Sequence, residues 1–92
     1  MDNIAELREK IDEIDDKILR LLRERTEVSK LIGEIKRKKG MPIRDQERER
    51  EKYTYVLRKA AELGLSLEAV RSIYQKIIEM SIQAQEQNVQ SV

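Results

Sequence analysis

A chain of 92 residues with 19 basic and 18 acidic side chains carries a net charge of only +1, although 40% of its residues are charged. This balance argues against a protein that coats phosphate backbones, because such proteins usually carry a clear basic excess. The chain contains no Cys and no His, which excludes disulfides, thiolate metal sites and the commonest general base.

The length predicts one small domain, 1–92, near the size at which a single hydrophobic core is barely sufficient. Aromatic residues make up only 3% of the chain, so that core must be aliphatic. No segment approaches the roughly 18 consecutive apolar residues of a membrane span, and the first residues lack the apolar centre of a signal peptide. We therefore expect a cytoplasmic protein that has no membrane partner.

Apolar residues recur at intervals of three and four along residues 4–35, which predicts one long helix with a single apolar seam. The seam positions are Ile4, Leu7, Ile11, Ile14, Ile18, Leu21, Arg25, Val28, Ile32 and Ile35. Such a helix is roughly 50 Å long, so it needs either a partner chain or other helices of its own chain along its whole length. Gly33 is expected to cost this helix about 1 kcal/mol relative to Ala.

The predicted ends of this first helix are at about residues 3 and 39. Asp2 or Asn3 can cap its start, and the basic cluster 36–39 followed by Gly40 is typical of a helix C-terminus. The same basic cluster could be interpreted as a nucleic-acid patch, but the balanced charge of the rest of the chain favours the capping interpretation.

Two further amphipathic helices are predicted, at about residues 46–63 with Asp45 as N-cap and at about residues 67–88 with Ser66 as N-cap. The last residues, 88–92, are expected to fray. The chain is therefore expected to be all-α, with one long, one short and one medium helix.

Polar residues interrupt two of the apolar stripes. Arg25 stands in the seam of the first helix, and Lys36 follows eleven residues later, which is about three turns and about 16 Å along the same side. Ser81 and Gln85, one turn apart, interrupt the stripe of the third helix. The second helix can add carboxylates at Asp45 and Glu49, with Arg48 between them.

These interruptions predict one polar pocket inside a helix bundle. A pocket of cations, amide and hydroxyl without a nucleophile and base can bind a polyanion and stabilise developing charge, but it does not suit acyl transfer or redox catalysis. Each residue also has a plainer interpretation, since a seam arginine can set register or reach to solvent, and Ser or Gln near a helix end can face water.

Four fragments of the chain, in this order and spacing, resemble the all-α class of chorismate mutases, the shikimate-pathway enzymes that convert chorismate to prephenate. The fragments are Leu7-Arg8-Glu9-Lys10-Ile11-Asp12 with Ile14-Asp15, Leu21-Leu22-x-Glu24-Arg25 with Lys36, Pro42-Ile43-Arg44-Asp45-x-x-Arg48-Glu49, and Ile77-Ile78-Glu79-x-Ser81-x-x-x-Gln85. The resemblance covers essentially the whole chain and implies an isomerase of aromatic amino acid biosynthesis that needs no cofactor and no metal.

The resemblance also implies roles at the reacting bond. Arg8, from the other protomer, and Arg25 would bind the two carboxylates of chorismate. Lys36 would be shared between a carboxylate and the ether oxygen of the breaking bond, and Gln85 would donate a second hydrogen bond to that oxygen. Because Gln85 is a neutral amide, we expect a rate that is nearly flat between about pH 5 and 9.

Four more roles follow from the same resemblance. Glu49 would accept a hydrogen bond from the substrate hydroxyl, aided by the region of Asp45 and oriented by Arg48, and Ser81 would lie beside the ring carboxylate.

The distance between two of these residues provides an argument from geometry. Arg8 and Arg25 are 17 residues apart, roughly 25 Å along one helix, so one small molecule cannot touch both in a single chain. Two long helices that pair antiparallel would bring Arg8 of one chain to the pocket of the other. The resemblance likewise implies an intertwined homodimeric helix bundle with two active sites.

Several alternatives stay open from the sequence. The chain could be a non-catalytic dimerisation module in which Arg25 only sets register, and nucleic-acid binding through residues 36–39 and Arg44 is disfavoured by the charge balance. The chain could also be a monofunctional enzyme or the mutase part of a fusion, with or without a partner enzyme of the shikimate pathway. Isochorismate is a substrate of some relatives, and the pocket residues do not rank it against chorismate.

Overall fold

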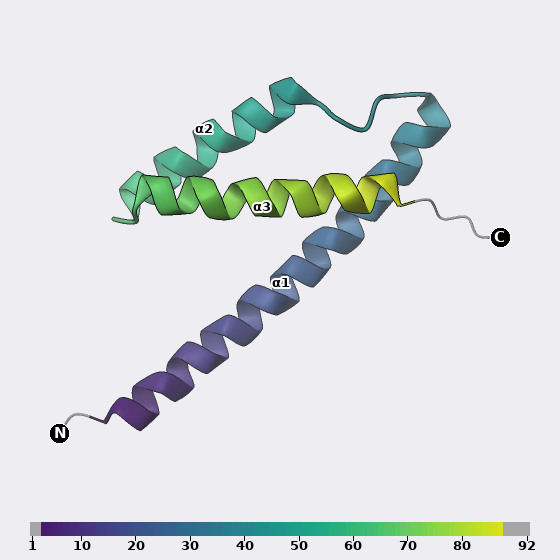
Figure 1. Cartoon of the computed structure of the whole chain (residues 1–92). Coiled ribbons are helices and arrows are strands. Elements are labelled where there is room, and N and C mark those ends of the chain that lie inside the picture. Colours follow the sequence, from purple (N-terminus) through teal and green to yellow (C-terminus); the bar gives the residue numbers. More distant parts are fainter. Residues whose placement is uncertain (1–2, 88–92) are drawn as a thin grey trace.

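The computed structural model describes residues 3–87, which form three α-helices (Figure 1). The helices are α1 (Ile4–Lys39), α2 (Gln46–Glu62) and α3 (Leu67–Glu86), and residues 3–87 contain no strand. The predicted fold class, all-α with one long, one short and one medium helix, is confirmed. The expected end of the third helix at residue 88, the fraying after it and the alternative cap Asp2 lie outside the described residues.

The helix ends follow the local chemistry of the sequence. Each helix starts with a side-chain oxygen that accepts a backbone N–H three residues later: Asn3 from Glu6 at 3.1 Å, Asp45 from Arg48 at 3.0 Å and Ser66 from Ala69 at 3.2 Å. Gly40 ends α1 in the left-handed region, with φ of 68°. This conformation suits glycine, and it lets the N–H of Met41 donate to the carbonyl of Lys36 at 2.8 Å.

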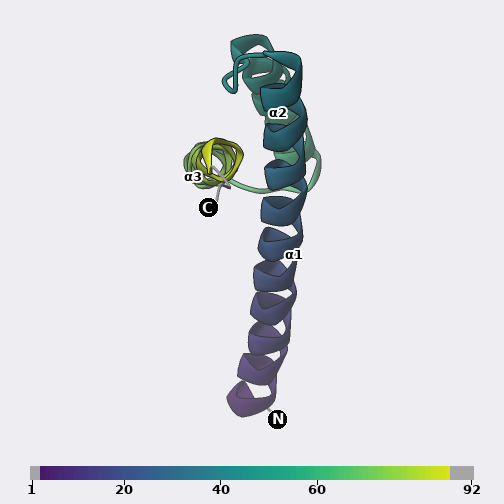
Figure 2. The ribbon, with the colours of Figure 1, turned by 90° about the vertical axis from the view of Figure 1, so that its right-hand side faces the viewer.

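The third helix holds the chain together. α3 packs against both α1 and α2, and it crosses the C-terminal half of α1 while running back alongside α2 (Figures 1 and 2). The chain measures 59 × 32 × 14 Å and its radius of gyration is 16.9 Å. A compact domain of this length would have a radius of gyration of about 12 Å. The single chain is therefore thin and extended.

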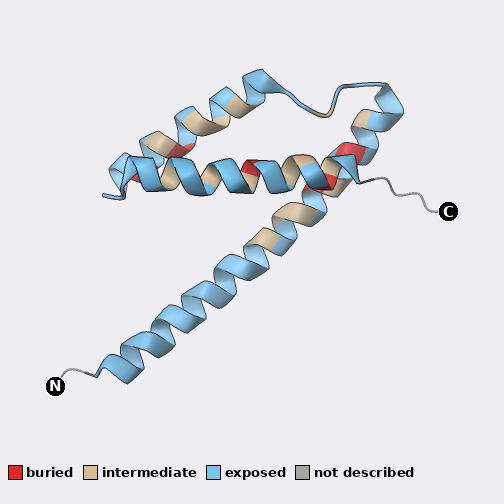
Figure 3. Ribbon diagram, in the orientation of Figure 1, coloured by how far each residue is buried: buried red, intermediate tan, exposed pale blue. Residues whose placement is uncertain are grey.

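A thin chain encloses little apolar surface. The buried hydrophobic side chains are Val56, Ala60, Ile78 and Ala84. Most seam residues of α1 are exposed: Ile4, Leu7 and Ile11 each keep 58% of their surface, and the N-terminal half of this helix is exposed throughout (Figure 3). A fully buried Leu or Ile contributes about 1.5–3 kcal/mol to stability. Burial of this exposed stripe against another surface would therefore stabilise the fold considerably. α1 does not fold over helices of its own chain along its whole length.

No helix among residues 3–87 is both long enough and apolar enough to cross a membrane.

Candidate active site

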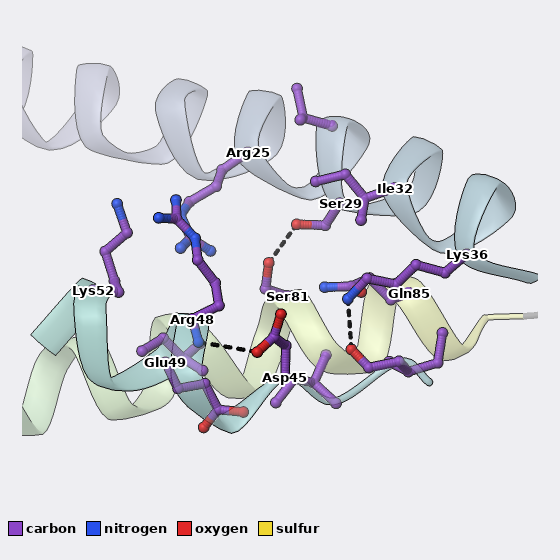
Figure 4. Close-up of a pocket in the computed structure, with 14 residues that line it drawn as sticks. Arg25, Ser29, Ile32, Lys36, Asp45, Arg48, Glu49, Lys52, Ser81 and Gln85 are labelled. Carbon is purple, nitrogen blue, oxygen red and sulfur yellow. Dashed lines mark hydrogen bonds between the residues drawn. The ribbon is translucent and has the colours of Figure 1, made fainter. Parts of the chain in front are cut away.

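A cavity of about 430 Å³ lies where α1 crosses α3, with the loop 40–45 and the start of α2 along its side (Figure 4). Seven of the eight residues that the sequence predicts for the site line this cavity: Arg25, Lys36, Asp45, Arg48, Glu49, Ser81 and Gln85. The eighth, Arg8, is exposed near the start of α1, roughly 25 Å of helix away from Arg25. The single chain therefore brings together all of the predicted residues except one.

Arg25 enters the cavity from the seam of α1. Its Nη1 donates to the carbonyl of Ile77 on α3 at 3.4 Å, and the side chain is partly buried. No carboxylate within residues 3–87 forms an ion pair with it. Because a partly buried guanidinium without a carboxylate is unfavourable, this charge is well placed to bind an anion from outside the chain.

Lys36 and Gln85 point into the other end of the same cavity (Figure 4). The Nζ of Lys36 donates to the carbonyl of Ile43 at 2.7 Å, which ties the ammonium to the loop between α1 and α2. The Oε1 of Gln85 is buried and has no hydrogen-bond partner within the described chain. An unsatisfied buried polar atom costs about 1–3 kcal/mol, so this amide is positioned at the expense of stability, as is common in functional sites.

Ser29 is a pocket residue that the sequence analysis missed. Its hydroxyl is hydrogen-bonded to that of Ser81 across the helix crossing, and Ser29 keeps only 3% of its surface exposed. Its spacing could have revealed it, because positions four residues after Arg25 and seven before Lys36 fall on one side of a helix. The bond between the two hydroxyls fixes where Ser81 stands in the cavity wall.

Gly33 allows α1 and α3 to approach closely beside the pocket. A Cβ atom at this position would lie 2.6 Å from the Cα and 2.9 Å from the carbonyl carbon of Gln85. The sequence analysis assigned this glycine only a loss of helix propensity. Its role in packing depends on the crossing of two helices, which local sequence does not reveal.

Both carboxylates that line the cavity, Asp45 and Glu49, accept hydrogen bonds from residues of the same chain. Arg44 donates to Glu49 through Nε at 2.9 Å and Nη2 at 3.1 Å, and the hydrogen bond and charge of Glu49 raise the pKa of Arg44. The expected orienting residue, Arg48, instead places Nη1 3.7 Å from Glu51, while its backbone N–H donates to Asp45. Within the described chain, the partner of Glu49 is therefore Arg44 and not Arg48.

Lys52 is a second cavity-lining residue that the sequence analysis missed. It lies one turn after Arg48 on α2, so both side chains are on the same face of that helix. Burial, followed by the charges of Arg48 and Arg25, lowers the pKa of Lys52. Its Nζ is 5.4 Å from the ring centroid of Tyr55.

The composition of the cavity defines what it can bind. The four cationic side chains are Arg25, Lys36, Arg48 and Lys52, and the apolar lining consists of Val28, Ile32, Ile43, Ile78 and Ile82. No group of three or more carboxylates that could hold a metal ion occurs among residues 3–87. A small molecule with more than one negative charge and an apolar body fits this combination.

Comparison with known proteins gives one consistent result. A family model described as chorismate mutase type II matches residues 7–86. The chain is 39% identical over 87 residues to a chorismate mutase of Methanocaldococcus jannaschii, an alignment that covers 95% of this chain and 88% of that protein. It is 47% identical over 81 residues to a bifunctional chorismate mutase/prephenate dehydratase of Aquifex aeolicus, and there it covers 85% of this chain but only 22% of the relative.

Among solved structures, a conserved hypothetical protein from Pyrococcus furiosus superimposes with a TM-score of 0.70 at 40% identity. The match covers 90% of this chain and 95% of that one.

Proposed function

Because the chain belongs to the chorismate mutase type II family, we propose that the cavity at the crossing of α1 and α3 is where it isomerises chorismate to prephenate. The observation that carries the proposal is the convergence of Arg25, Lys36 and Gln85, from two helices, on one cavity. This reaction breaks a carbon–oxygen bond as a carbon–carbon bond forms, and it needs no proton transfer. A site of cations and an amide, in a chain without His or Cys, suits such a rearrangement.

The first contribution of the site is conformational. Arg25 binds one carboxylate of the substrate, and Arg8 of a second protomer binds the other. With both carboxylates held, the flexible enolpyruvyl arm stays over the ring in a near-attack arrangement, which removes part of the entropic barrier. Ser81, fixed by its bond to Ser29, lies beside the ring carboxylate.

The second contribution is electrostatic. Lys36 and Gln85 donate hydrogen bonds to the ether oxygen, where negative charge grows as the carbon–oxygen bond breaks. These bonds are stronger in the transition state than in the ground state, so they raise kcat. Lys36 contributes more than Gln85, because a charged donor forms a stronger hydrogen bond than a neutral amide.

The carboxylates at the rim bind the substrate hydroxyl. Glu49 accepts the hydrogen bond from this hydroxyl, and Asp45 and Arg48 line the cavity beside it. Arg44 donates to both oxygens of Glu49, which fixes the carboxylate in place.

A homodimer completes the site. The exposed apolar residues of the N-terminal half of α1 support an antiparallel pairing of two long helices, which would bury this stripe and bring Arg8 to the pocket of the second chain. We also propose a cytoplasmic location. A partner enzyme of the same pathway is not required by this arrangement.

The decisive experiment follows the loss of chorismate absorbance on addition of the purified protein, with prephenate identified as the product. Arg25→Ala is measured alongside, together with its helicity and its molar mass in solution. Saturable conversion that Arg25→Ala loses while it stays helical and dimeric would support the proposal.

A different result would contradict the proposed mutase activity. A folded wild-type dimer that converts neither chorismate nor isochorismate would favour a non-catalytic dimerisation module. That alternative also predicts that Arg25→Leu stabilises the dimer without loss of function.

A further inference from the structure

We propose that Lys52 is a substrate-binding residue that provides a second cation for the carboxylate held by Arg25. The inference deepens the proposed function and rests on it. It concerns a lysine that none of the sequence motifs contains and whose neighbours on the chain, Glu51 and Tyr53, gave no reason to single it out.

The position of Lys52 supports this role. Arg25 from α1 and Arg48 and Lys52 from α2 line the same end of the cavity, while Lys36 and Gln85 point into it from the opposite end (Figure 4). A substrate that presents its ether oxygen to Lys36 therefore has a carboxylate to place at the end occupied by Arg25 and Lys52.

Within the described residues, no carboxylate balances Lys52. It forms none of the ion pairs of the chain, and the pocket acid Glu49 is held by both donors of Arg44. Its Nζ lies 5.4 Å from the centroid of the Tyr55 ring. This contact lets the ammonium stay partly buried without neutralising its charge.

The electrostatic environment adds a second argument. The pKa of Lys52 is lowered, first by burial and then by repulsion from Arg48 and Arg25, so the charged lysine is unfavourable in the free protein. An anion bound between these three cations offsets these effects, because it supplies a counter-charge that favours the protonated amine. The cavity is thus arranged for an anion at the cost of repulsion among its own cationic residues.

This location predicts which kinetic constant Lys52 affects. A carboxylate keeps its full charge from the ground state to the transition state, so a cation that binds it stabilises both states alike. Such uniform binding lowers KM and leaves kcat nearly unchanged. Lys36, at the ether oxygen, is expected to behave in the opposite way.

A purely structural role is the competing explanation, since the aliphatic stem of a lysine can cover apolar surface. Lys52→Met keeps an unbranched apolar stem and removes only the charge, and Lys52→Arg restores the charge. Lys59→Met is the matched control, because Lys59 lies on the same helix, pairs with Glu62 at 3.7 Å and is not part of the cavity lining.

The experiment measures kcat and KM of the wild type and the three variants for chorismate at low and high salt. We expect Lys52→Met to raise KM about tenfold, because the loss of one hydrogen bond to a charged group at a partly solvated site has an effect of this size. Its kcat should stay within about twofold of the wild-type value. Lys52→Arg should recover most of this loss, and Lys59→Met should match the wild type. The KM of Lys52→Met should also depend less on salt than that of the wild type.

Three outcomes would overturn the inference: an unchanged KM in Lys52→Met, a loss confined to kcat, or an equal loss in Lys59→Met. Calorimetric titration of wild type and Lys52→Met with chorismate separates this inference from the proposed function. A wild type that binds chorismate without converting it contradicts the function, and the two dissociation constants still test Lys52. A wild type that does not bind chorismate contradicts both.

Discussion

Gly33 of α1 lies so close to the main chain of Gln85 of α3 that a methyl group at Gly33 would come within 2.6 Å of the Gln85 Cα. The crossing of the two helices therefore sets the position of the Gln85 amide at the end of the cavity that it shares with Lys36. Packing and proposed chemistry depend on the same contact.

Gly33→Ala is expected to lower both stability and activity. The added methyl meets backbone atoms, which cannot rotate away, so α3 must shift. Overpacking of this kind typically costs about 1–3 kcal/mol, and the gain in helix propensity of about 1 kcal/mol offsets only part of it. Urea unfolding at fixed protein concentration and kcat for chorismate measure the two effects.

Glu34→Ala is the control for Gly33→Ala, because Glu34 is the next residue on α1 and is exposed. We expect its stability to stay within about 0.5 kcal/mol of the wild type. A Gly33→Ala variant with the stability and kcat of the wild type would show that the helices are not in close contact here.

Lys52 is expected to reduce the stability of the free protein at neutral pH. Its pKa in the folded chain is lowered by burial and by Arg48 and Arg25, so the unfolded chain binds more protons between this pKa and the unfolded value of about 10.4. Stability linked to Lys52 therefore rises as the pH increases through the lowered pKa. Lys52→Met should be more stable than the wild type at pH 7, and the difference should shrink towards about pH 10.

Thermal unfolding of Lys52→Met and Lys59→Met against the wild type, at pH 7 and at about pH 9.5, checks this expectation. Lys59 is more than half exposed and paired with Glu62, so its replacement should produce no such trend. A Lys52→Met variant that is less stable than the wild type at pH 7 would show that the stem and the Tyr55 contact outweigh the repulsion.

Replacing Gln85 by Glu should create an acid-preferring enzyme. The amide can donate to the ether oxygen at any pH, whereas a carboxyl group donates only when protonated. The kcat of the wild type is expected to be nearly flat between about pH 5 and 9, and that of Gln85→Glu to fall as the pH rises through the pKa of the new side chain. A pH profile of Gln85→Glu that matches the wild type would show that this side chain does not face the reacting oxygen.

Mixing two inactive variants should restore activity if each site draws on two chains. In a heterodimer of Arg8→Ala and Arg25→Ala, one site carries both defects and the other carries neither. Random exchange between the two variants would leave about a quarter of all sites intact, because half of the dimers are mixed and each has one whole site. Activity of the re-equilibrated mixture, compared with each variant alone, is the measurement. No recovery despite mass-spectrometric proof of exchange would place Arg8 outside the site.

The helices themselves were predictable because their signals are local. The intervals of three and four along α1, and the caps Asn3, Asp45 and Ser66, need only the neighbouring residues. The observed starts of the three helices, and the ends of α1 and α2, lie within one residue of those expected. The grouping of Arg25 with Lys36 was equally accessible, because both lie on one side of a single helix.

Other features of the site depend on contacts between elements. Whether Gly33 is a weak helix residue or a required close approach is decided by α3, which is more than 30 residues away in sequence. Glu49 could have been paired with either of two nearby arginines, and the conformation of the loop before α2 selects Arg44. Lys52 could not be singled out from the sequence, because nothing local indicates that Arg25 of α1 lines the same cavity.

The hydrogen bond from Lys36 to the carbonyl of Ile43 has a consequence for how such a chain can change in evolution. Connections between helices usually accept inserted residues, since a longer loop costs little additional closure entropy. Residues 40–45 supply the acceptor that holds the ammonium and end at Asp45, which is both a helix cap and part of the cavity wall. Insertions and deletions should therefore be tolerated between α2 and α3, around Gly64, and should abolish activity between α1 and α2, where the connection forms part of the proposed active site.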